Sequence, residues 1–308
     1  MSEKIFDTII IGGGPAGYTA ALYCTRAGLS TLVLEKFSAG GQMTQTSTID
    51  NYPGFEEGID GFSLGFKMQQ GAERFGAETL QTEVLSVDLN ANPKKIVTDS
   101  GELFSKTVII ATGADHKHLG IDKEESLIGR GVGYCAACDG MLFRGKTVAV
   151  VGGGNSAAAD ALLLSKICQK VYVIVRRDVL NATKIYHEPL MQTENVEFKW
   201  NSNVRELLHG MKLSGIRIEN KNGESEEIAL DGLFISIGRQ PATEIFAGQI
   251  ELDRSGYVIA DESTKTNIPG VFAVGDVRTK VLRQIITAAA DGAVAVHFAE
   301  EYLAENDR

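Results

Sequence analysis

The sequence predicts an α/β fold in which one strand–turn–helix–strand unit occurs twice. An apolar run leads into the glycine-rich turn 12–17 near the N-terminus, and a similar run leads into the glycine-rich turn 152–157. Each turn is followed by a helical pattern and then by another apolar run, as in the nucleotide-binding half of a doubly wound sheet. The 34 glycines and six prolines among 308 residues fit a protein with many tight strand-to-helix turns.

The two copies are in register with each other. From Gly12 to Glu35, where the second apolar run ends, is 23 residues, and from Gly152 to Val175 is also 23. A further apolar run that ends in glycine closes each copy, so a duplicated unit is the simplest account. The expected strands are 7–11, 31–34 and 108–113 in the first copy and 147–151, 171–175 and 233–238 in the second, with helices at about 18–27 and up to about 166.

The first copy resumes after the second. Residues 270–276 form another apolar run that ends in a glycine turn, and a helical pattern follows from about 283 to 303. We therefore expect two nested Rossmann-like dinucleotide-binding domains. One comprises 1–115 and 243–308, and the other is inserted between them at 116–242.

Composition limits the classes of partner. Lys and Arg number 30 against 40 Asp and Glu, a net charge of −10, which argues against nucleic acid or an anionic membrane as partner. No apolar run approaches the length of a membrane span, and the N-terminus has no signal-peptide pattern. Four cysteines, two of them isolated, favour a reducing compartment, so we expect a cytoplasmic location.

The segment with the strongest chemical signal holds Cys135 and Cys138, separated by two alanines and followed directly by Asp139. Two thiols at this spacing can close into an easily reduced disulfide, and the acid offers a proton source or sink. Half of a zinc site has the same spacing. Zinc needs further ligands, however, and the remaining cysteines, Cys24 and Cys168, stand alone in helical patterns, where inert buried thiols are expected. The pattern favours redox chemistry, with no metal.

Each glycine turn has a strand before it and a helix after it, which makes the nucleotide-binding interpretation much stronger than a lone G-x-G-x-x-G. The glycines allow a pyrophosphate to approach the backbone at the positive end of the helix. A glycine-rich turn without a ligand is the alternative. The residues expected to bind are Gly12, Gly14, Pro15, Ala16 and Gly17 in the first turn and Gly152, Gly154, Asn155, Ser156 and Ala157 in the second.

The two copies differ where the adenosine ribose is expected. Glu35 can accept hydrogen bonds from both ribose hydroxyls, whereas the equivalent Val175 is followed by Arg176 and Arg177. A carboxylate repels a 2′-phosphate and guanidinium groups attract it, although a solvated basic strand end is the alternative for the arginines. The sequence thus predicts FAD at the first site and NADPH at the second. Asn181 stands where another positively charged side chain could add to the attraction for the 2′-phosphate.

In their order and spacing these motifs resemble those of the low-molecular-weight bacterial thioredoxin reductases. The resemblance extends over essentially the whole chain. The chain differs from glutathione-reductase-like enzymes, because in those enzymes the dithiol lies near the N-terminus. The matching motifs are 12–17, Gly40-Gly41-Gln42, Ala111-Thr112-Gly113, 135–140, 152–157, Arg176-Arg177 and Gly275-Asp276.

The resemblance implies a homodimer in which electrons pass from NADPH through FAD and the dithiol to thioredoxin. It also implies that Cys138 faces the flavin, that Cys135 attacks the partner disulfide, and that Asp139 donates or accepts the proton. For the polar loop residue Asn51, the alternative to a flavin contact is a role in forming a turn. For the Arg283-Gln284 pair, the alternative is that these residues only begin a helix. The further residues expected to contact FAD are Gly41, Gln42, Asn51, Thr112, Gly113, Gly275, Asp276, Arg283 and Gln284.

Three positions depart from the family pattern. Ala137 stands where threonine is usual, and Val175 and Asn181 stand where the family usually has histidine and a third arginine. The last two leave other redox partners open within the same enzyme class: ferredoxin as donor, or oxygen or a peroxidase component as acceptor. A flavin-binding module without turnover is an alternative of a different class, against which the intact dithiol and Asp139 argue.

Overall fold

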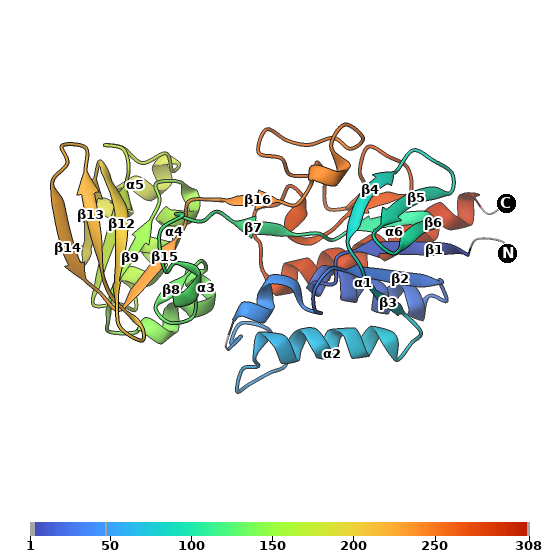
Figure 1. Cartoon of the computed structure of the whole chain (residues 1–308), viewed down its shortest axis with the longest axis horizontal. Helices are drawn as coiled ribbons and strands as arrows, with labels where there is room; N and C mark the ends of the chain where they lie inside the picture. The colour runs from blue at the N-terminus through green and yellow to red at the C-terminus, as the bar shows by residue number, and fades with distance from the viewer. Residues whose placement is uncertain (1–3, 47, 307–308) are drawn as a thin grey trace. The chain divides into compact units, whose positions relative to one another are not determined.

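The computed structural model describes residues 4–46 and 48–306. The chain divides into two compact units, which we call the outer unit, Met1–Asp115 with Gln240–Arg308, and the inserted unit, His116–Arg239. The sequence places the end of the inserted domain at 242; in the structure the chain leaves the inserted unit after Arg239. Figure 1 shows both units and labels all six α-helices of the described residues and many of the strands.

The outer unit is built on a seven-stranded sheet. Its strands are β1 Ile5–Ile11, β2 Thr31–Glu35, β3 Glu78–Gln81, β4 Val84–Asp88, β5 Lys94–Thr98, β6 Gly101–Ile110 and β17 Val271–Ala273; its helices are α1 Pro15–Arg26, α2 Gly61–Glu73 and α6 Ile285–Asn306. The strand order is β3-β2-β1-β6-β5-β4, and β17 pairs with the C-terminal part of β6. The β4 and β5 strands are antiparallel to their neighbours, and the other pairs are parallel.

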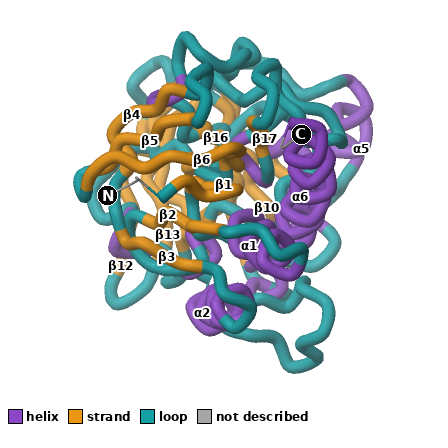
Figure 2. The backbone as a smooth tube through the Cα atoms, turned by 90° about the vertical axis from the view of Figure 1, so that its right-hand side faces the viewer, coloured by secondary structure: helices purple, strands orange, loops and turns teal. Residues whose placement is uncertain are grey.

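Helices α1 and α6 pack side by side on one face of this sheet (Figure 2). A Cβ atom on Gly292 of α6 would lie 2.3 Å from the carbonyl oxygen of Ala16, so only glycine permits this approach. Similarly, a Cβ atom on Gly17 would lie 1.9 Å from the carbonyl oxygen of Gly12. These contacts hold the start of α1 tightly against both the glycine turn and α6. The opposite face of the sheet packs against the segment 246–268.

The inserted unit repeats the central part of this arrangement. Its main sheet is fully parallel, in the order β11-β10-β9-β15-β8, and a three-stranded antiparallel sheet β12-β13-β14 covers one face while α4 covers the other. The elements are β8 Val132–Gly133, α3 Ala136–Asp139, β9 Thr147–Val151, α4 Asn155–Ser165, β10 Lys170–Val175, α5 His187–Gln192, β11 Val196–Trp200, β12 Ser202–His209, β13 Leu213–Asn220, β14 Ser225–Ala229 and β15 Gly232–Ile235.

The duplication predicted from the sequence is visible in the strand pairing. In the outer unit β1 pairs in parallel with β2 on one side and β6 on the other, and in the inserted unit β9 pairs in the same way with β10 and β15. The α/β fold class with two Rossmann-type domains is therefore confirmed. The chain passes between the two units twice, through β7 Ala114–His116 and through β16 Arg239–Pro241. These two strands pair with each other. Within the described residues, no helix is both long enough and apolar enough to cross a membrane.

Candidate active site

A disulfide joins Cys135 and Cys138, whose Cα atoms lie 5.3 Å apart. It lies in the inserted unit, where Cys135 directly precedes the short helix α3 and Cys138 lies within it. The amides of Cys138 and Asp139 both donate hydrogen bonds to the carbonyl oxygen of Cys135, at 3.1 Å each, and the Ala136 side chain is buried in the core. The turn of α3 thus brings the two sulfur atoms together, as a redox-active pair requires.

The carboxyl group of Asp139 lies in a partly dehydrated position beside this turn. Burial raises the pKa of Asp139 above its ordinary value. A Cβ atom on Gly133 would lie 3.2 Å from its Oδ2 atom, so the carboxyl group lies close to the strand that leads into the disulfide. A carboxyl group with a raised pKa keeps its proton at a higher pH than an exposed aspartate, which suits proton exchange with a thiolate.

The first glycine turn leaves an open space in front of α1. Gly12 has φ of +109°, and a Cβ atom there would lie 2.4 Å from the carbonyl oxygen of Ala111. A Cβ atom on Gly14, in contrast, would meet no atom within 4 Å, and α1 begins at the next residue, Pro15. Gly12 is therefore required by the protein's own packing, whereas Gly14 borders a space at the positive end of the helix where a pyrophosphate fits.

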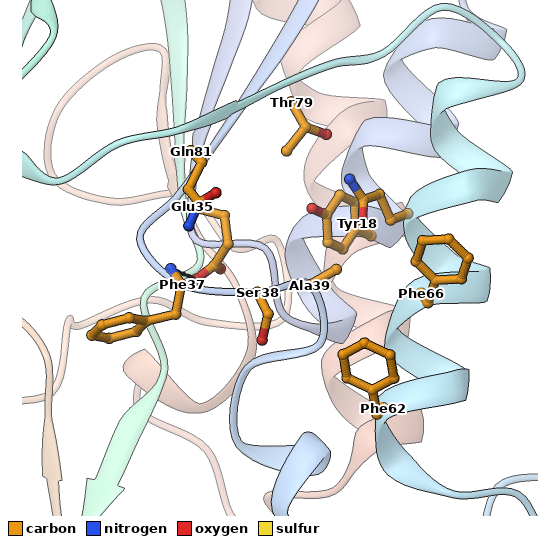
Figure 3. Close-up of a pocket in the computed structure, with 10 residues that line it drawn as sticks. Tyr18, Glu35, Phe37, Ser38, Ala39, Phe62, Phe66, Thr79 and Gln81 are labelled. Atoms are coloured by element: carbon orange, nitrogen blue, oxygen red, sulfur yellow. Dashed lines mark hydrogen bonds between the residues drawn. The ribbon is translucent and has the colours of Figure 1, made fainter.

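Glu35, at the end of β2, is held by two backbone amides. Gly13 donates to its Oε2 atom at 2.6 Å and Phe37 donates to its Oε1 atom at 3.0 Å. The carboxylate borders a pocket of about 210 Å³, and Figure 3 shows the Phe37 hydrogen bond and the side chains around this pocket. Each carboxylate oxygen has a further lone pair for a ribose hydroxyl. The pocket is lined by Tyr18, Glu35, Phe37, Ser38, Ala39, Phe62, Phe66, Gln69, Thr79 and Gln81.

Several residues predicted to contact flavin come together although they are far apart in the sequence. The Nδ2 atom of Asn51 donates to Oε1 of Gln284 at 3.0 Å, across 233 positions. The Nε2 atom of Gln42 donates to the carbonyl oxygen of Ala114 at 2.6 Å, directly after Gly113. The structure thus gathers the loops after β2 and β6 and the segment before α6.

Two further glycines bring their loops to the first turn. A Cβ atom on Gly41 would lie 3.5 Å from the Cα atom of Gly14, and one on Gly275 would lie 3.0 Å from the Cβ atom of Ala16. Two more of the predicted contact residues are fixed through backbone carbonyls. Thr112 donates to the carbonyl oxygen of Ala242 at 2.7 Å, and Nε of Arg283 donates to the carbonyl oxygen of Asp276 at 3.3 Å.

The second glycine turn has the same division of roles. Gly152 has φ of +144°, and a Cβ atom there would lie 2.3 Å from the carbonyl oxygen of Ser236 and 2.9 Å from the Cβ atom of the buried Ala157. A Cβ atom on Gly154 would again meet no atom within 4 Å. Asn155 and Ser156 are exposed in the first turn of α4. This turn could therefore hold a second pyrophosphate.

The two arginines predicted to select NADPH are exposed just after β10. Nη1 of Arg177 donates to Oδ1 of Asn181 at 3.2 Å, and the amide of Asn181 donates to the carbonyl oxygen of Gly153 at 2.7 Å. Asn181 therefore does not add a charge to this basic pair. It connects Arg177 to the glycine turn instead.

The other two cysteines are buried, in agreement with the expectation that they are inert. Burial raises the pKa of Cys24 to about 12 and that of Cys168 to about 11, so both remain thiols at physiological pH. In the described part of the chain no three His, Cys, Asp or Glu side chains form a group that could hold a metal ion.

One feature near these loops was not predicted from the sequence. The buried carboxylate of Asp291 accepts hydrogen bonds from Arg278 and Lys280, both buried as well. The signal available in the sequence was an acid within the otherwise apolar first half of α6, residues 285–296. Only the fold reveals that its partners lie 13 and 11 positions earlier.

Comparison with known proteins agrees with this geometry. A model of the family described as pyridine nucleotide-disulphide oxidoreductase matches residues 6–292. The chain belongs to this family. Both the disulfide and the two glycine turns, which the sequence predicts, are thus found in a member of a family named for nucleotide and disulfide chemistry.

Individual proteins are similar to this chain over almost their full length. A thioredoxin reductase of Streptomyces clavuligerus is 45% identical, covering 99% of this chain and 95% of that protein. One of Listeria monocytogenes is 45% identical, covering 98% and 95%. The crystal structure of thioredoxin reductase from Streptococcus pyogenes matches with a TM-score of 0.92 and 42% identity, covering 99% of this chain and 100% of that one. The resemblance noted from the sequence motifs is confirmed.

Proposed function

We propose that the protein is an NADPH-dependent thioredoxin-disulfide reductase that uses FAD and NADPH. The observation that carries this proposal is the Cys135–Cys138 disulfide, which lies beside the partly buried Asp139 in a unit that also has a nucleotide-type glycine turn. Relatives named thioredoxin reductase, aligned over nearly the whole chain, support the same activity. The substrate is the disulfide of another protein.

FAD belongs in the outer unit. The open space at Gly14 in front of α1 fits its pyrophosphate, and Glu35 has lone pairs left for the ribose hydroxyls. When bound, FAD supplies the two-electron relay between the nicotinamide and the disulfide. The remaining residues proposed to hold it are Gly12, Pro15, Ala16, Gly17, Gly41, Gln42, Asn51, Thr112, Gly113, Gly275, Asp276, Arg283 and Gln284.

NADPH belongs in the inserted unit. The open space at Gly154 fits its pyrophosphate, and the exposed guanidinium groups of Arg176 and Arg177 are free to approach the 2′-phosphate from solvent. The hydrogen bond from Arg177 to Asn181 orients one of them. The remaining residues proposed to contact NADPH are Gly152, Asn155, Ser156 and Ala157.

The dithiol carries out the exchange with the partner. Reduction of the Cys135–Cys138 disulfide takes up two electrons and two protons. The Cys135 thiolate then attacks one sulfur of the partner disulfide, so that a mixed disulfide forms and the other partner sulfur leaves as a thiolate. Cys138 attacks Cys135 in turn, which restores the intramolecular disulfide and releases the reduced partner. Asp139 holds a proton close to this exchange: it gives the proton to a departing thiolate, or takes one up from a thiol that becomes the attacking thiolate.

The surface next to the disulfide suits a protein substrate. Met141 and Leu142 follow the C-x-x-C-D segment after one intervening glycine, and each is 56% exposed. Apolar side chains exposed beside a reactive group are typical of a docking site. We propose that thioredoxin contacts them. We also propose that the protein acts as a homodimer in the cytoplasm, where a reducing environment fits the free thiols of Cys24 and Cys168.

The test is a coupled assay with purified protein. NADPH oxidation is followed at 340 nm while oxidised thioredoxin is added, and the same assay is run with Cys135→Ser. We expect oxidation that depends on thioredoxin and disappears in the variant. Turnover that requires reduced ferredoxin, a peroxidase component or oxygen would assign the alternative redox partners. Bound flavin that NADPH never bleaches would indicate a flavin-binding module.

A further inference from the structure

A buried cluster of charges lies behind the loop that carries Asp276. It consists of Asp291 on α6 and of Arg278 and Lys280 in the loop 275–284 before that helix. The side chains of these residues are only 8%, 2% and 6% exposed. Burying three charges is costly unless each is paired, so the cluster calls for a physical explanation.

Asp291 is the centre of the cluster. Its Oδ2 atom accepts hydrogen bonds from Nε of Arg278 and Nζ of Lys280, and its Oδ1 atom accepts one from Nη2 of Arg278, all at 2.8 Å. Burial alone would raise the pKa of Asp291, but the hydrogen bonds from Arg278 and Lys280 lower it below its ordinary value. The carboxylate is thus ionised and tethers both cations.

The same carboxylate also holds the backbone of the loop. The amide of Gly275 donates to Oδ2 of Asp291 at 2.8 Å, one residue before Asp276. Gly275 lies against Ala16, at the end of α1 that faces the first glycine turn. Arg283 continues the connection, since it donates to the backbone carbonyls of Asp276 and Arg278. Asp291 therefore fixes the segment that presents Asp276.

We propose that Asp291 is a positioning residue for FAD, which acts through Arg278, Lys280 and the Gly275 amide to hold Asp276 in its binding position. This inference rests on the proposed function, since it takes Asp276 as a contact of the flavin. A preorganised loop loses less conformational freedom when the ligand binds, and this raises affinity. Without the carboxylate, Arg278 and Lys280 lose the buried negative charge that they share, and the loop is expected to open.

A double-mutant cycle on FAD release tests this role. Asp276→Ala, Asp291→Asn and the double variant are loaded with FAD, and the rise in free flavin fluorescence gives each dissociation rate. We expect each single change to accelerate release about tenfold or more, the effect of losing a charged hydrogen bond. Because Asp291 acts through Asp276, the double variant should release FAD no faster than the faster single variant. A merely structural role for Asp291 would multiply the two effects.

The chain offers a matched control in Glu262. Its carboxylate lies 3.6 Å from Nη2 of Arg278, but its side chain is 95% exposed, so Glu262→Gln should leave FAD release unchanged. Should Asp291→Asn fail to fold, Lys280→Met replaces it in the cycle, because the Arg278–Asp291 pair is then kept.

The outcomes separate the two claims. Multiplied rates, or unchanged release in Asp291→Asn, would overturn the positioning role alone. A wild-type protein that takes up no FAD would overturn the proposed function itself, and with it this inference.

Discussion

The backbone amide of Gly13 donates a hydrogen bond to Oε2 of Glu35 at 2.6 Å. This bond connects the middle of the first glycine turn to the end of β2, where the sequence predicts recognition of the ribose. Because the backbone amide of Phe37 donates to the other oxygen, the protein's own backbone holds both oxygens of the carboxylate. In the outer unit, the turn and the acid that we propose to bind the ribose are thus one preorganised element.

The open space beside Gly14 allows a test of the FAD site that leaves the protein's own packing unchanged. A Cβ atom on Gly14 meets nothing within 4 Å, so Gly14→Ala should fold normally and fail only where FAD must approach. We expect FAD affinity to fall by about tenfold or more, since packing a methyl group against a ligand forces one of them away. Gly71→Ala in α2 is the control, because Gly71 also borders open space. Full FAD content in Gly14→Ala, measured by the absorbance ratio at 450 and 280 nm, would show that the site is misassigned.

Nucleotide preference should depend on Arg176 and Arg177. Replacing both by alanine removes charged hydrogen bonds to the 2′-phosphate, each worth roughly 1.5–3 kcal/mol, and should raise the KM for NADPH about ten- to a hundredfold or more. The KM for NADH should hardly change. Arg205→Ala, at an exposed arginine elsewhere in the inserted unit, is the control. Equal use of both nucleotides by the wild type would contradict the assignment.

Asp139 should make folding stability depend on pH. Its pKa is raised in the folded state by burial, so the folded protein binds this proton more tightly than the unfolded chain does. The stability from this site is therefore complete below the unfolded pKa, about 3.9, and is lost as the pH rises through the raised folded value.

Asp139→Asn stays neutral at every pH. We expect it to melt at a higher temperature than the wild type at neutral pH, with the difference vanishing in acid, while reduction of thioredoxin becomes slower. Melting curves across the pH range measure this, with the exposed Asp178→Asn as control. A variant that melts below the wild type at neutral pH would argue against the buried carboxyl group.

Docking of the protein substrate should depend on Met141 and Leu142. Serine at both positions removes exposed apolar surface beside the disulfide. The KM for thioredoxin should rise several-fold, and the reduction of the flavin by NADPH should keep its rate. Met211→Ser, at a methionine that is 93% exposed in the same unit, is the control. If the control and the double variant behave alike, the docking site lies elsewhere.

The sequence predicts the local elements of this protein well. Fingerprint and spacing identify β1, β2, β9 and β10, because buried parallel strands are continuous apolar runs and the glycine turns mark their ends. The C-x-x-C spacing identifies the disulfide because the two cysteines are close to each other in the chain. The first helix starts three residues earlier than expected, at Pro15, whose fixed φ suits the first helical position.

Long-range features could not be predicted in this way. The three-stranded sheet β12-β13-β14 depends on pairing across hairpins with mixed polar and apolar residues, and its strands show no strong period. The role of Asn181 depends on its contact with Gly153, and that of Asp291 on two cations that the fold brings to it. Single residues give no sign of such partners before the backbone path is known.

The most direct test of the account is an anaerobic titration of the flavin with NADPH, followed by oxidised thioredoxin. If the disulfide accepts electrons after FAD, the wild type should consume about twice as much NADPH per FAD as the Cys135→Ser, Cys138→Ser double variant, because each group holds two electrons. Oxidised thioredoxin should then restore the flavin absorbance of the wild type alone. If Cys138 is the sulfur that faces the flavin, as the family resemblance implies, the single variant Cys135→Ser should in addition show a long-wavelength absorbance from a Cys138 thiolate, and Cys138→Ser should not. Equal NADPH consumption by the wild type and the double variant would contradict the central claim that the disulfide lies on the electron path.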